Sequence, residues 1–154
     1  MNSTGLHWIL LSFEELTPVQ LYALLRLRSE VFVVEQRCVF LDMDGKDAAC
    51  WHLLGYTEQG ELAAYTRLVP AGVTFIHASI GRVVTSPLHR ASGYGRALMQ
   101  QSIQALYNLY GPCPIQIGAQ LYLRAFYESF GFRVCGELYV EDGIDHVEML
   151  RGIH

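Results

Sequence analysis

The sequence predicts an α/β protein in which a mixed sheet carries helices on its faces. Strand-like apolar runs alternate with segments whose apolar residues recur at helical spacing, in the order β-α-β-β-β-α-β-α-β-β. Glycines and prolines typical of turns separate these segments. Of the 154 residues, 51% are apolar and 17% are charged, which suits one domain over residues 1–154 with one hydrophobic core.

The first strand and the first helix follow each other closely. Residues 7–13 (HWILLSF) are bulky and apolar, as expected of a strand. Thr17 can cap a helix, because Gln20 completes a capping box and Pro18 fits the first helical position. Apolar residues then continue at helical spacing, so we expect one helix that runs to about Glu35.

The middle of the chain is predicted to form a loop and three strands. Residues 36–50 are loop-like. Residues 51–57 and 62–69 have the composition of strands, and a hairpin turn at 58–61 connects them. The next strand is clearest at 80–85.

The C-terminal part opens with a glycine-rich loop. A helix follows the loop to about Tyr110, where Gly111 and Pro112 stop it. A strand is expected at 115–118, and a second helix at 120–130, which Gly131 ends. Two strands follow at 133–140 and 144–150.

Charge, hydropathy and cysteine count exclude several classes of protein. The formal net charge is −4 and there is no basic stripe, which argues against a nucleic-acid partner. No apolar run approaches the roughly 18 residues of a membrane span, and we expect a cytoplasmic protein without a signal peptide. The four cysteines match no zinc spacing and are expected to be reduced, buried thiols.

Residues 36–50 contain side chains of the type that bind metal ions. Asp42, Asp44 and Asp47 lie around a glycine, and His52 follows. The Asp-x-Asp-Gly run is similar to a calcium loop, but the glutamate that should end such a loop is missing. We therefore predict no metal and a solvated acidic loop, which could attract a cationic amine.

The stretch HRASGYGRALM, from His89 onward, places a glycine loop at the start of a helix. The N–H groups of a first helical turn point outward, and the helix dipole favours an anion there. Gly93 and Gly95 lack a Cβ, so a diphosphate could approach the main chain. Arg90 and Arg96 could add charge-assisted hydrogen bonds to phosphate oxygens.

Several interpretations of this loop compete. A P-loop requires Lys-Ser or Lys-Thr, which does not occur here. A dinucleotide fingerprint requires a small residue where Leu98 stands. The remaining interpretations are an R-x-x-G-x-G loop for the pyrophosphate of coenzyme A and a plain turn between strand and helix.

A second motif makes the pattern specific. The run RASGYG at 90–95 and the run YESFGF at 127–132 resemble the two main motifs of the GNAT N-acetyltransferase superfamily. The strand at 80–85 precedes the first motif as it does in that family. Softer matches to the ElaA-like branch are at 27–36, 44–47, 51–54 and 139–144. The resemblance extends from about residue 20 to 151.

The resemblance implies a fold and a cosubstrate. It implies a central mixed, mostly antiparallel sheet of about six to seven strands flanked by helices, and acetyl-CoA as acetyl donor. The strand residues Val83, Val84 and Thr85 would pair with the pantetheine arm through their backbone, beside a splayed sheet. Gln120 stands where many relatives carry Asn and would hydrogen-bond the coenzyme. The pyrophosphate would be held by Arg90, Ala91, Ser92, Gly93, Tyr94, Gly95 and Arg96.

The resemblance also suggests catalytic roles. Tyr127 matches the family tyrosine near the sulfur and would act as general acid to the departing thiolate; the alternative is a buried structural tyrosine. The acceptor amine must lose a proton, for which Glu35 is the first candidate base and His52 the second. Alternatively, Glu35 pairs with an arginine and His52 is a hydrogen-bonded residue of the sheet.

The predicted function is transfer of an acetyl group from acetyl-CoA to the amine of a small molecule or a peptide. An acyl-CoA-binding or sensing module without turnover is the alternative from another class. A nucleotide-dependent protein, which predicts binding of ATP or NAD, is a third. A homodimer through strand edges stays open.

Overall fold

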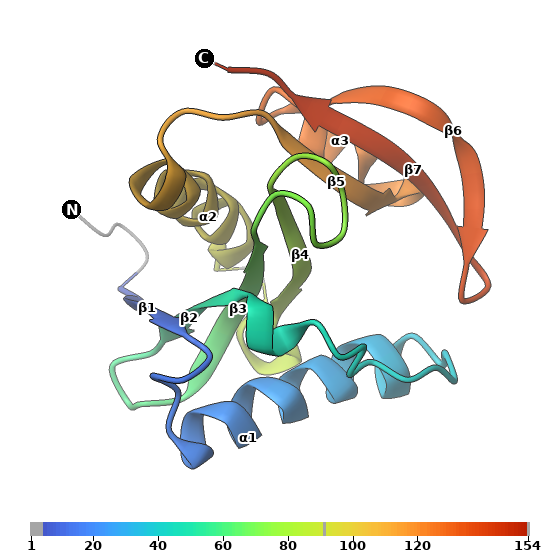
Figure 1. Ribbon diagram of the computed structural model, residues 1–154. Coiled ribbons are helices and arrows are strands. Elements are labelled where there is room, and N and C mark those ends of the chain that lie inside the picture. The colour runs from blue at the N-terminus through green and yellow to red at the C-terminus, as the bar shows by residue number, and fades with distance from the viewer. Residues whose placement is uncertain (1–4, 91, 154) are drawn as a thin grey trace.

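The computed structural model describes residues 5–90 and 92–153, and the described part follows the predicted order of strands and helices (Figure 1). The helices are α1 (Pro18–Arg28), α2 (Tyr94–Tyr110) and α3 (Arg124–Glu128). The strands are β1 (His7–Ser12), β2 (Trp51–Tyr56), β3 (Leu62–Val69), β4 (Ser79–Thr85), β5 (Ile115–Gln120), β6 (Arg133–Glu141) and β7 (Ile144–Arg151).

The strands form two antiparallel sheets. The N-terminal sheet has the strand order β1-β2-β3-β4, and the C-terminal sheet has the order β5-β7-β6. Within the described residues, one parallel bridge between Ala78 and Ile115 connects them, so the expected central sheet is divided into two halves. The mixed, mostly antiparallel fold that the sequence predicts is confirmed. Figure 1 shows β5, β6 and β7 on one side of β4, and the other strands of the N-terminal sheet with α1 on the other side.

The first helix begins as predicted, and its last turns differ. The Thr17 hydroxyl accepts a hydrogen bond from the Gln20 N–H at 3.1 Å, and the Gln20 carboxamide accepts one from the Thr17 N–H at 2.9 Å. The helical segment ends at Glu35, as predicted, but its last turns form a π-helix at Ser29–Glu35 in place of the expected α-helix. The Gln36 N–H donates to the Val31 carbonyl at 3.0 Å, five residues back. This wider turn carries Gln36 to the gap between the sheets.

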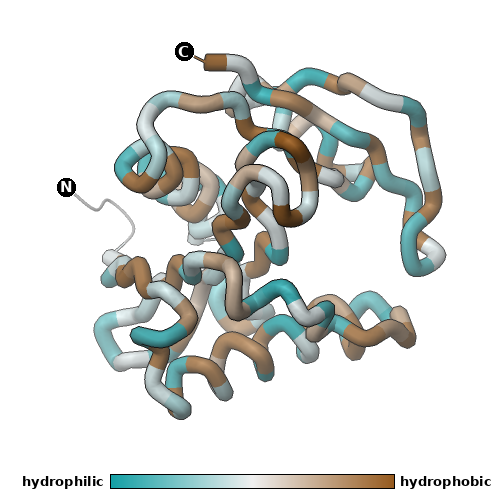
Figure 2. Tube along the Cα trace, viewed as in Figure 1, coloured by the Kyte–Doolittle hydropathy of each residue, from teal (hydrophilic) through white to brown (hydrophobic). Residues whose placement is uncertain are grey.

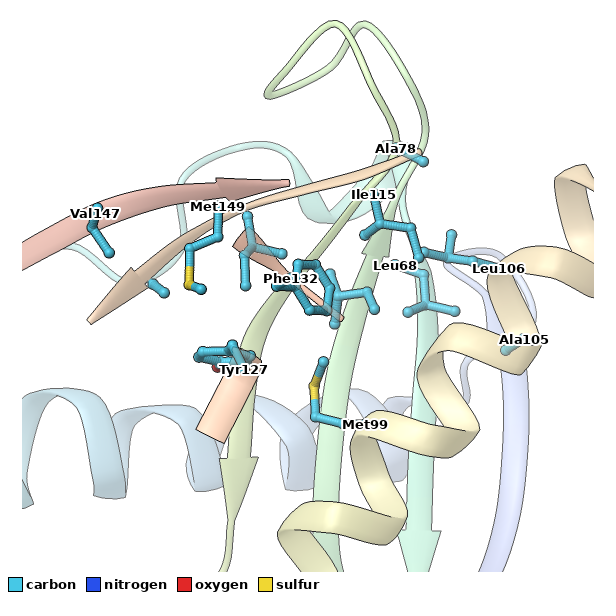
Figure 3. Packing of buried hydrophobic residues seen from close by; sticks show 13 residues of the cluster. Leu68, Ala78, Met99, Ala105, Leu106, Ile115, Tyr127, Phe132, Val147 and Met149 are labelled. Carbon is cyan, nitrogen blue, oxygen red and sulfur yellow. The ribbon is translucent and has the colours of Figure 1, made fainter. Parts of the chain in front are cut away.

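The hydrophobic core has a part on each side of the N-terminal sheet. The larger part lies between the strands, α2 and α3, and includes Leu106, Ile115 and Phe132, which are at most 1% exposed (Figure 3). A second part lies under α1 and includes Leu24 and Tyr65. The turn between β6 and β7 is hydrophilic (Figure 2). Both sheets are thus anchored by burial.

The prediction of a solvated acidic loop at residues 36–50 is wrong. Asp42 is 6% exposed and accepts hydrogen bonds from Arg28 and from Arg82, each at 2.8 Å. Asp47 accepts one from Arg28 at 2.8 Å. Asp44 accepts two from Arg67, also at 2.8 Å. The three aspartates and three arginines form an ion-pair network that fixes the loop against α1, β3 and β4.

The aspartate pKa values reflect this network. Burial alone would raise the pKa of Asp44, but hydrogen bonds from Arg67 and from the Lys46 N–H hold it well below its usual range. Burial likewise opposes the ionisation of Asp47, and hydrogen bonds from Arg28 and Arg67 lower its pKa overall. The carboxylates are therefore charged and paired.

Three further predictions concern cysteines, metals and membranes. All four cysteines are free thiols, as expected, but only Cys38 and Cys50 are buried, whereas Cys113 is half-buried and Cys135 is exposed. Among the described residues, no group of three or more histidine, cysteine, aspartate or glutamate side chains is placed to hold a metal ion. In residues 5–90 and 92–153, none of the helices combines the length and the hydropathy that a membrane crossing requires.

Candidate active site

A cleft of about 360 Å³ opens where the two sheets diverge. Strand β4 forms one wall and β5 the other. The π-helix contributes Phe32, Gln36 follows directly after it, and the turn between β6 and β7 contributes Glu141 and Asp142. Segments far apart in sequence thus surround one cavity, which is the typical setting of a ligand site.

A bulge in β4 shapes one wall. Tyr65 of β3 pairs with Val84, and Arg67 pairs with Gly81, so β4 has one residue more than β3 over this stretch. Arg82 in the bulge has a φ of 50°, and its guanidinium is held by Asp42 at 2.8 Å. Past the Ala78 bridge, β4 pairs with no strand on its β5 side in the described chain. Its backbone is available there to an extended ligand.

The predicted strand residues Val83, Val84 and Thr85 lie on this wall and line the cleft. The glycine loop follows directly, and α2 begins at its N-cap, Gly93. Gly93 has a φ of 74° and provides no side-chain cap. The first N–H groups of α2 therefore keep the outward direction that suits an anion. A Cβ built on Gly93 meets no atom within 4 Å, so the main chain borders open space.

The two arginines of the glycine loop are both bound to other side chains. Arg90 lines the cleft, and its guanidinium makes two hydrogen bonds to the Glu35 carboxylate at 2.6 and 2.8 Å. The Arg96 guanidinium donates to the Ser129 hydroxyl at 3.0 Å and covers the Phe130 ring. The remaining members of the predicted set are Ser92, Tyr94 and Gly95, which surround the start of α2, and Ala91, which lies outside the described residues.

Tyr127 reaches the cleft from α3. Its side chain is 6% exposed and packs edge-on against Phe126 and Phe132, with ring centroids 5.3 and 6.0 Å away. Figure 3 shows it beside Met99 and Phe132, at the margin of the core. Burial raises the pKa of Tyr127, so the phenol keeps its proton well beyond neutral pH. A protonated phenol in a cleft is suited to donate a proton.

Gln120 lines the cleft and is already engaged. Its carboxamide and that of Gln36 exchange hydrogen bonds at 3.2 and 3.3 Å. Close by, the Cys38 thiol donates to the Asp142 carbonyl at 2.8 Å. These two contacts join the segment after the π-helix to the C-terminal sheet across the cleft. A ligand that uses the Gln120 amide must compete with Gln36.

Neither predicted base is free. His52 is 0% exposed, with Nδ1 2.6 Å from the Tyr65 hydroxyl and Nε2 2.9 Å from the Asp47 carbonyl. Burial lowers its pKa, and it is not among the residues that line the cleft. The structure thus places His52 as a hydrogen-bonded residue of the sheet. Hydrogen bonding to Arg90 lowers the pKa of Glu35, which makes it a weak proton acceptor.

The cleft contains side chains that the sequence reasoning did not single out. His146 of β7 and Glu141 of β6 line it, together with Phe32 and Phe40. No local motif marks His146. The available signal is the strand pairing, which sets His146 opposite Gln120 of β5, and a sequence alone does not reveal that β7 lies between β5 and β6.

Known proteins share this architecture. The family model described as an acetyltransferase (GNAT) domain matches residues 34–151. The protein ElaA of Escherichia coli is 40% identical over 150 residues, covering 96% of this chain and 97% of ElaA. A UPF0039 protein of Synechocystis is 39% identical over 145 residues, covering 94% of each chain.

Solved structures agree with the sequence relatives. The structure of an acyl-CoA N-acyltransferase from Pseudomonas aeruginosa superposes with a TM-score of 0.89 at 40% identity, covering 95% of this chain and 99% of that one. The structure of Escherichia coli ElaA superposes with a TM-score of 0.87 at 40% identity and the same coverage.

Proposed function

Because this chain belongs to the GNAT acetyltransferase family and is an acyltransferase, we propose that it transfers an acetyl group from acetyl-CoA to a primary amine. The observation that carries the proposal is the continuous path along the bulged edge of β4 to the uncapped start of α2. An extended arm with a diphosphate at one end fits this path. The amine belongs to a small molecule or a peptide.

The residues of this chain fit the donor in two places. The main-chain N–H groups of residues 92–96 would hold the pyrophosphate, because Gly93 leaves open space beside them. The backbone of Val83, Val84 and Thr85 would pair with the pantetheine arm. The acetyl thioester supplies an activated acyl group, and an N–H of the bulge would polarise its carbonyl.

Tyr127 would act as the general acid. Its hydroxyl would give its proton to the sulfur as the C–S bond breaks, which avoids release of a free thiolate. The raised pKa means that the phenol carries its proton near neutral pH, which is the form that a general acid requires. To act as a base, Glu35 would first have to break its hydrogen bonds to Arg90. His52 would have to break those to the Tyr65 hydroxyl and the Asp47 carbonyl.

The proposal is tested by calorimetric titration with acetyl-CoA, CoA, ATP and NAD in parallel. We expect acetyl-CoA and CoA to bind and ATP and NAD not to bind. Gly93→Glu should abolish the binding, because it places a carboxylate where the pyrophosphate would lie. Gly60→Glu is the matched control, since Gly60 also has a positive φ, 83°, and open space around it but lies in the β2–β3 turn.

Two outcomes would contradict the proposal. A protein that binds no CoA would leave the glycine loop as a plain turn. A protein that binds acetyl-CoA but acetylates no amine in a broad panel would favour the acyl-CoA-binding or sensing module instead.

A further inference from the structure

We propose that His146 is the catalytic base of this chain, and that its Nε2 takes the proton which the incoming ammonium group must lose. The inference rests on the proposed acetyl transfer and adds the residue that neither Glu35 nor His52 supplies. It is carried by the position of His146, by the hydrogen bond of its other ring nitrogen and by the carboxylate next to it.

His146 occupies the middle strand of the C-terminal sheet. It pairs with Gln120 of β5 on one side and with Tyr139 of β6 on the other. Its side chain is 10% exposed and lines the same cleft as Tyr127. Of the histidines within residues 5–90 and 92–153, it alone lines that cleft.

The hydrogen bonding of His146 fixes the position of its lone pair. Nδ1 lies 2.7 Å from the carbonyl oxygen of Ile144. A carbonyl oxygen only accepts, so Nδ1 must carry the hydrogen of this bond. In the neutral imidazole the other nitrogen, Nε2, then holds the lone pair. The backbone thus sets the tautomer that a base acting through Nε2 requires.

A carboxylate and an aromatic ring flank the imidazole. The Glu141 carboxylate lies 3.8 Å from Nε2, close enough to attract an ammonium group to that nitrogen. The Tyr139 ring stacks on the imidazole at 5.5 Å and restricts its orientation. The Tyr139 hydroxyl lies over Gly118, where an added Cβ would come within 2.5 Å of it. Gly118 therefore leaves the space that this ring needs.

The other titratable groups around the cleft do not compete for this role. Arg82 of β4 is bound to Asp42, and Arg90 is bound to Glu35. The remaining titratable side chains that line the cleft are Tyr122, Tyr127, Glu141 and Asp142, with Tyr139 behind the imidazole. Burial raises the pKa values of Tyr127 and Tyr139, so these phenols do not act as bases, and the Glu141 and Asp142 carboxylates add the negative charge that attracts an ammonium group.

The protons balance. The ammonium group loses one proton to Nε2, which passes it to solvent, and the freed lone pair forms the new N–C bond as the C–S bond breaks. The sulfur takes the Tyr127 proton, and the second proton that the nitrogen sheds restores the phenol. One ammonium and one thioester thus give one amide, one thiol and one released proton.

The tautomer can be tested without any acceptor. Nitrogen NMR of the imidazoles in the full-length protein, followed across pH, should show the neutral form of the His146 ring with its hydrogen on Nδ1, and His146→Gln should remove that signal. A neutral ring with its hydrogen on Nε2 would overturn the proposal, because Nε2 would then have no lone pair to offer.

The kinetic test uses spermidine, phenethylamine and a lysine-containing peptide as probes across pH. For any probe that the wild type acetylates, His146→Gln should lower kcat/KM near neutral pH by about 100-fold or more. The loss should shrink in alkali, where the amine arrives unprotonated. Coenzyme affinity should stay unchanged, and His146→Asn, which can keep the bond to the Ile144 carbonyl, should behave like His146→Gln. His7→Gln, an exposed histidine on β1, is the control.

The outcomes separate the two proposals. An active wild type whose pH profile survives both His146 substitutions overturns the role of His146 alone. A wild type that binds no CoA and acetylates none of the probes overturns the acetyl transfer itself, and the role of His146 with it.

Discussion

At the scale of single residues, the cleft separates groups that can exchange protons from groups that are already bound. Tyr127 and His146 line it, and each has one polar atom suited to proton transfer. His52 has both ring nitrogens in hydrogen bonds outside the cleft, and Glu35 is paired with Arg90. Residue type alone does not distinguish these cases; the hydrogen-bond partners do.

Tyr127→Phe should slow turnover without weakening coenzyme binding. The change removes only the hydroxyl, so the edge-on packing against Phe126 and Phe132 remains. Loss of a general acid costs roughly 100-fold or more in kcat. Steady-state kinetics with an accepted amine, beside calorimetry with CoA, would measure both quantities.

Tyr22→Phe, at an exposed tyrosine of α1, is the control for this variant. The raised pKa of Tyr127 adds a second expectation. The wild type should keep its rate above about pH 10, where an ordinary tyrosine loses its proton. Unchanged turnover in Tyr127→Phe would exclude the phenol as the acid.

At the scale of elements, the loop at 36–50 depends on its ion pairs. Asp47 binds both Arg28 and Arg67, and Arg28 is 0% exposed. Removing one member of a buried pair leaves the other charge poorly compensated, which costs about 3 kcal/mol. Asp47→Asn should therefore lower the free energy of unfolding by about that amount in urea titrations.

The same variant should change how stability depends on pH. The folded pKa of Asp47 lies below its unfolded value of about 4. The stabilisation is therefore fully present above about pH 4 and is lost as the pH falls through the folded pKa. Asp47→Asn should lose less stability than the wild type over that acid range. Asp145→Asn, at an exposed aspartate, should follow the wild type, and equal acid slopes for all three would refute the argument.

The sequence predicts those elements whose signals are local. The capping box at Thr17 and the glycine start of α2 are both found as predicted, because each depends on residues within one turn. The π-helix has no comparable signal, since Ser29–Glu35 carries an ordinary helical pattern. The π-helix begins directly after Arg28, which belongs to the ion-pair network, and it contributes Phe32 to the cleft.

In the candidate site, too, local motifs can be predicted from the sequence and contacts between distant segments cannot. The glycine loop and Tyr127 belong to motifs that can be read in order along the chain. The pairing of Arg28, Arg67 and Arg82 with the loop aspartates joins four separate segments. Likewise, His146 enters the cleft only through the pairing of β7 with β5. Contacts of this kind depend on the tertiary fold, which residue spacing does not encode.

At the scale of the whole molecule, the two sheets meet through the buried core at one end, while towards the cleft the described residues join them by a few hydrogen bonds only. A ligand that lies between them should therefore hold them together. At a concentration 100-fold above its Kd, acetyl-CoA should stabilise the fold by about 2.7 kcal/mol. For a domain of this size the Tm should rise by roughly 5–10 °C. Differential scanning calorimetry measures this shift.

Gly93→Glu should show no such shift, whereas Gly60→Glu should keep it. A wild-type Tm that does not change with acetyl-CoA would contradict the bridging position of the ligand. The homodimer that the sequence left open stays a prediction. Strand β6 is the edge to examine for it, because it pairs only with β7 in the described chain and exposes Leu138 and Val140.

The strand order β5-β7-β6 also governs when the cleft can exist during synthesis. In the described chain, β5 and β6 do not pair with each other, and β7 is the strand that joins them. While a ribosome is still translating the codons of β7, the N-terminal sheet can already be formed, but the opposite wall has no middle strand. The same segment then completes that wall and delivers His146. A nascent chain should thus acquire its cleft in one late step.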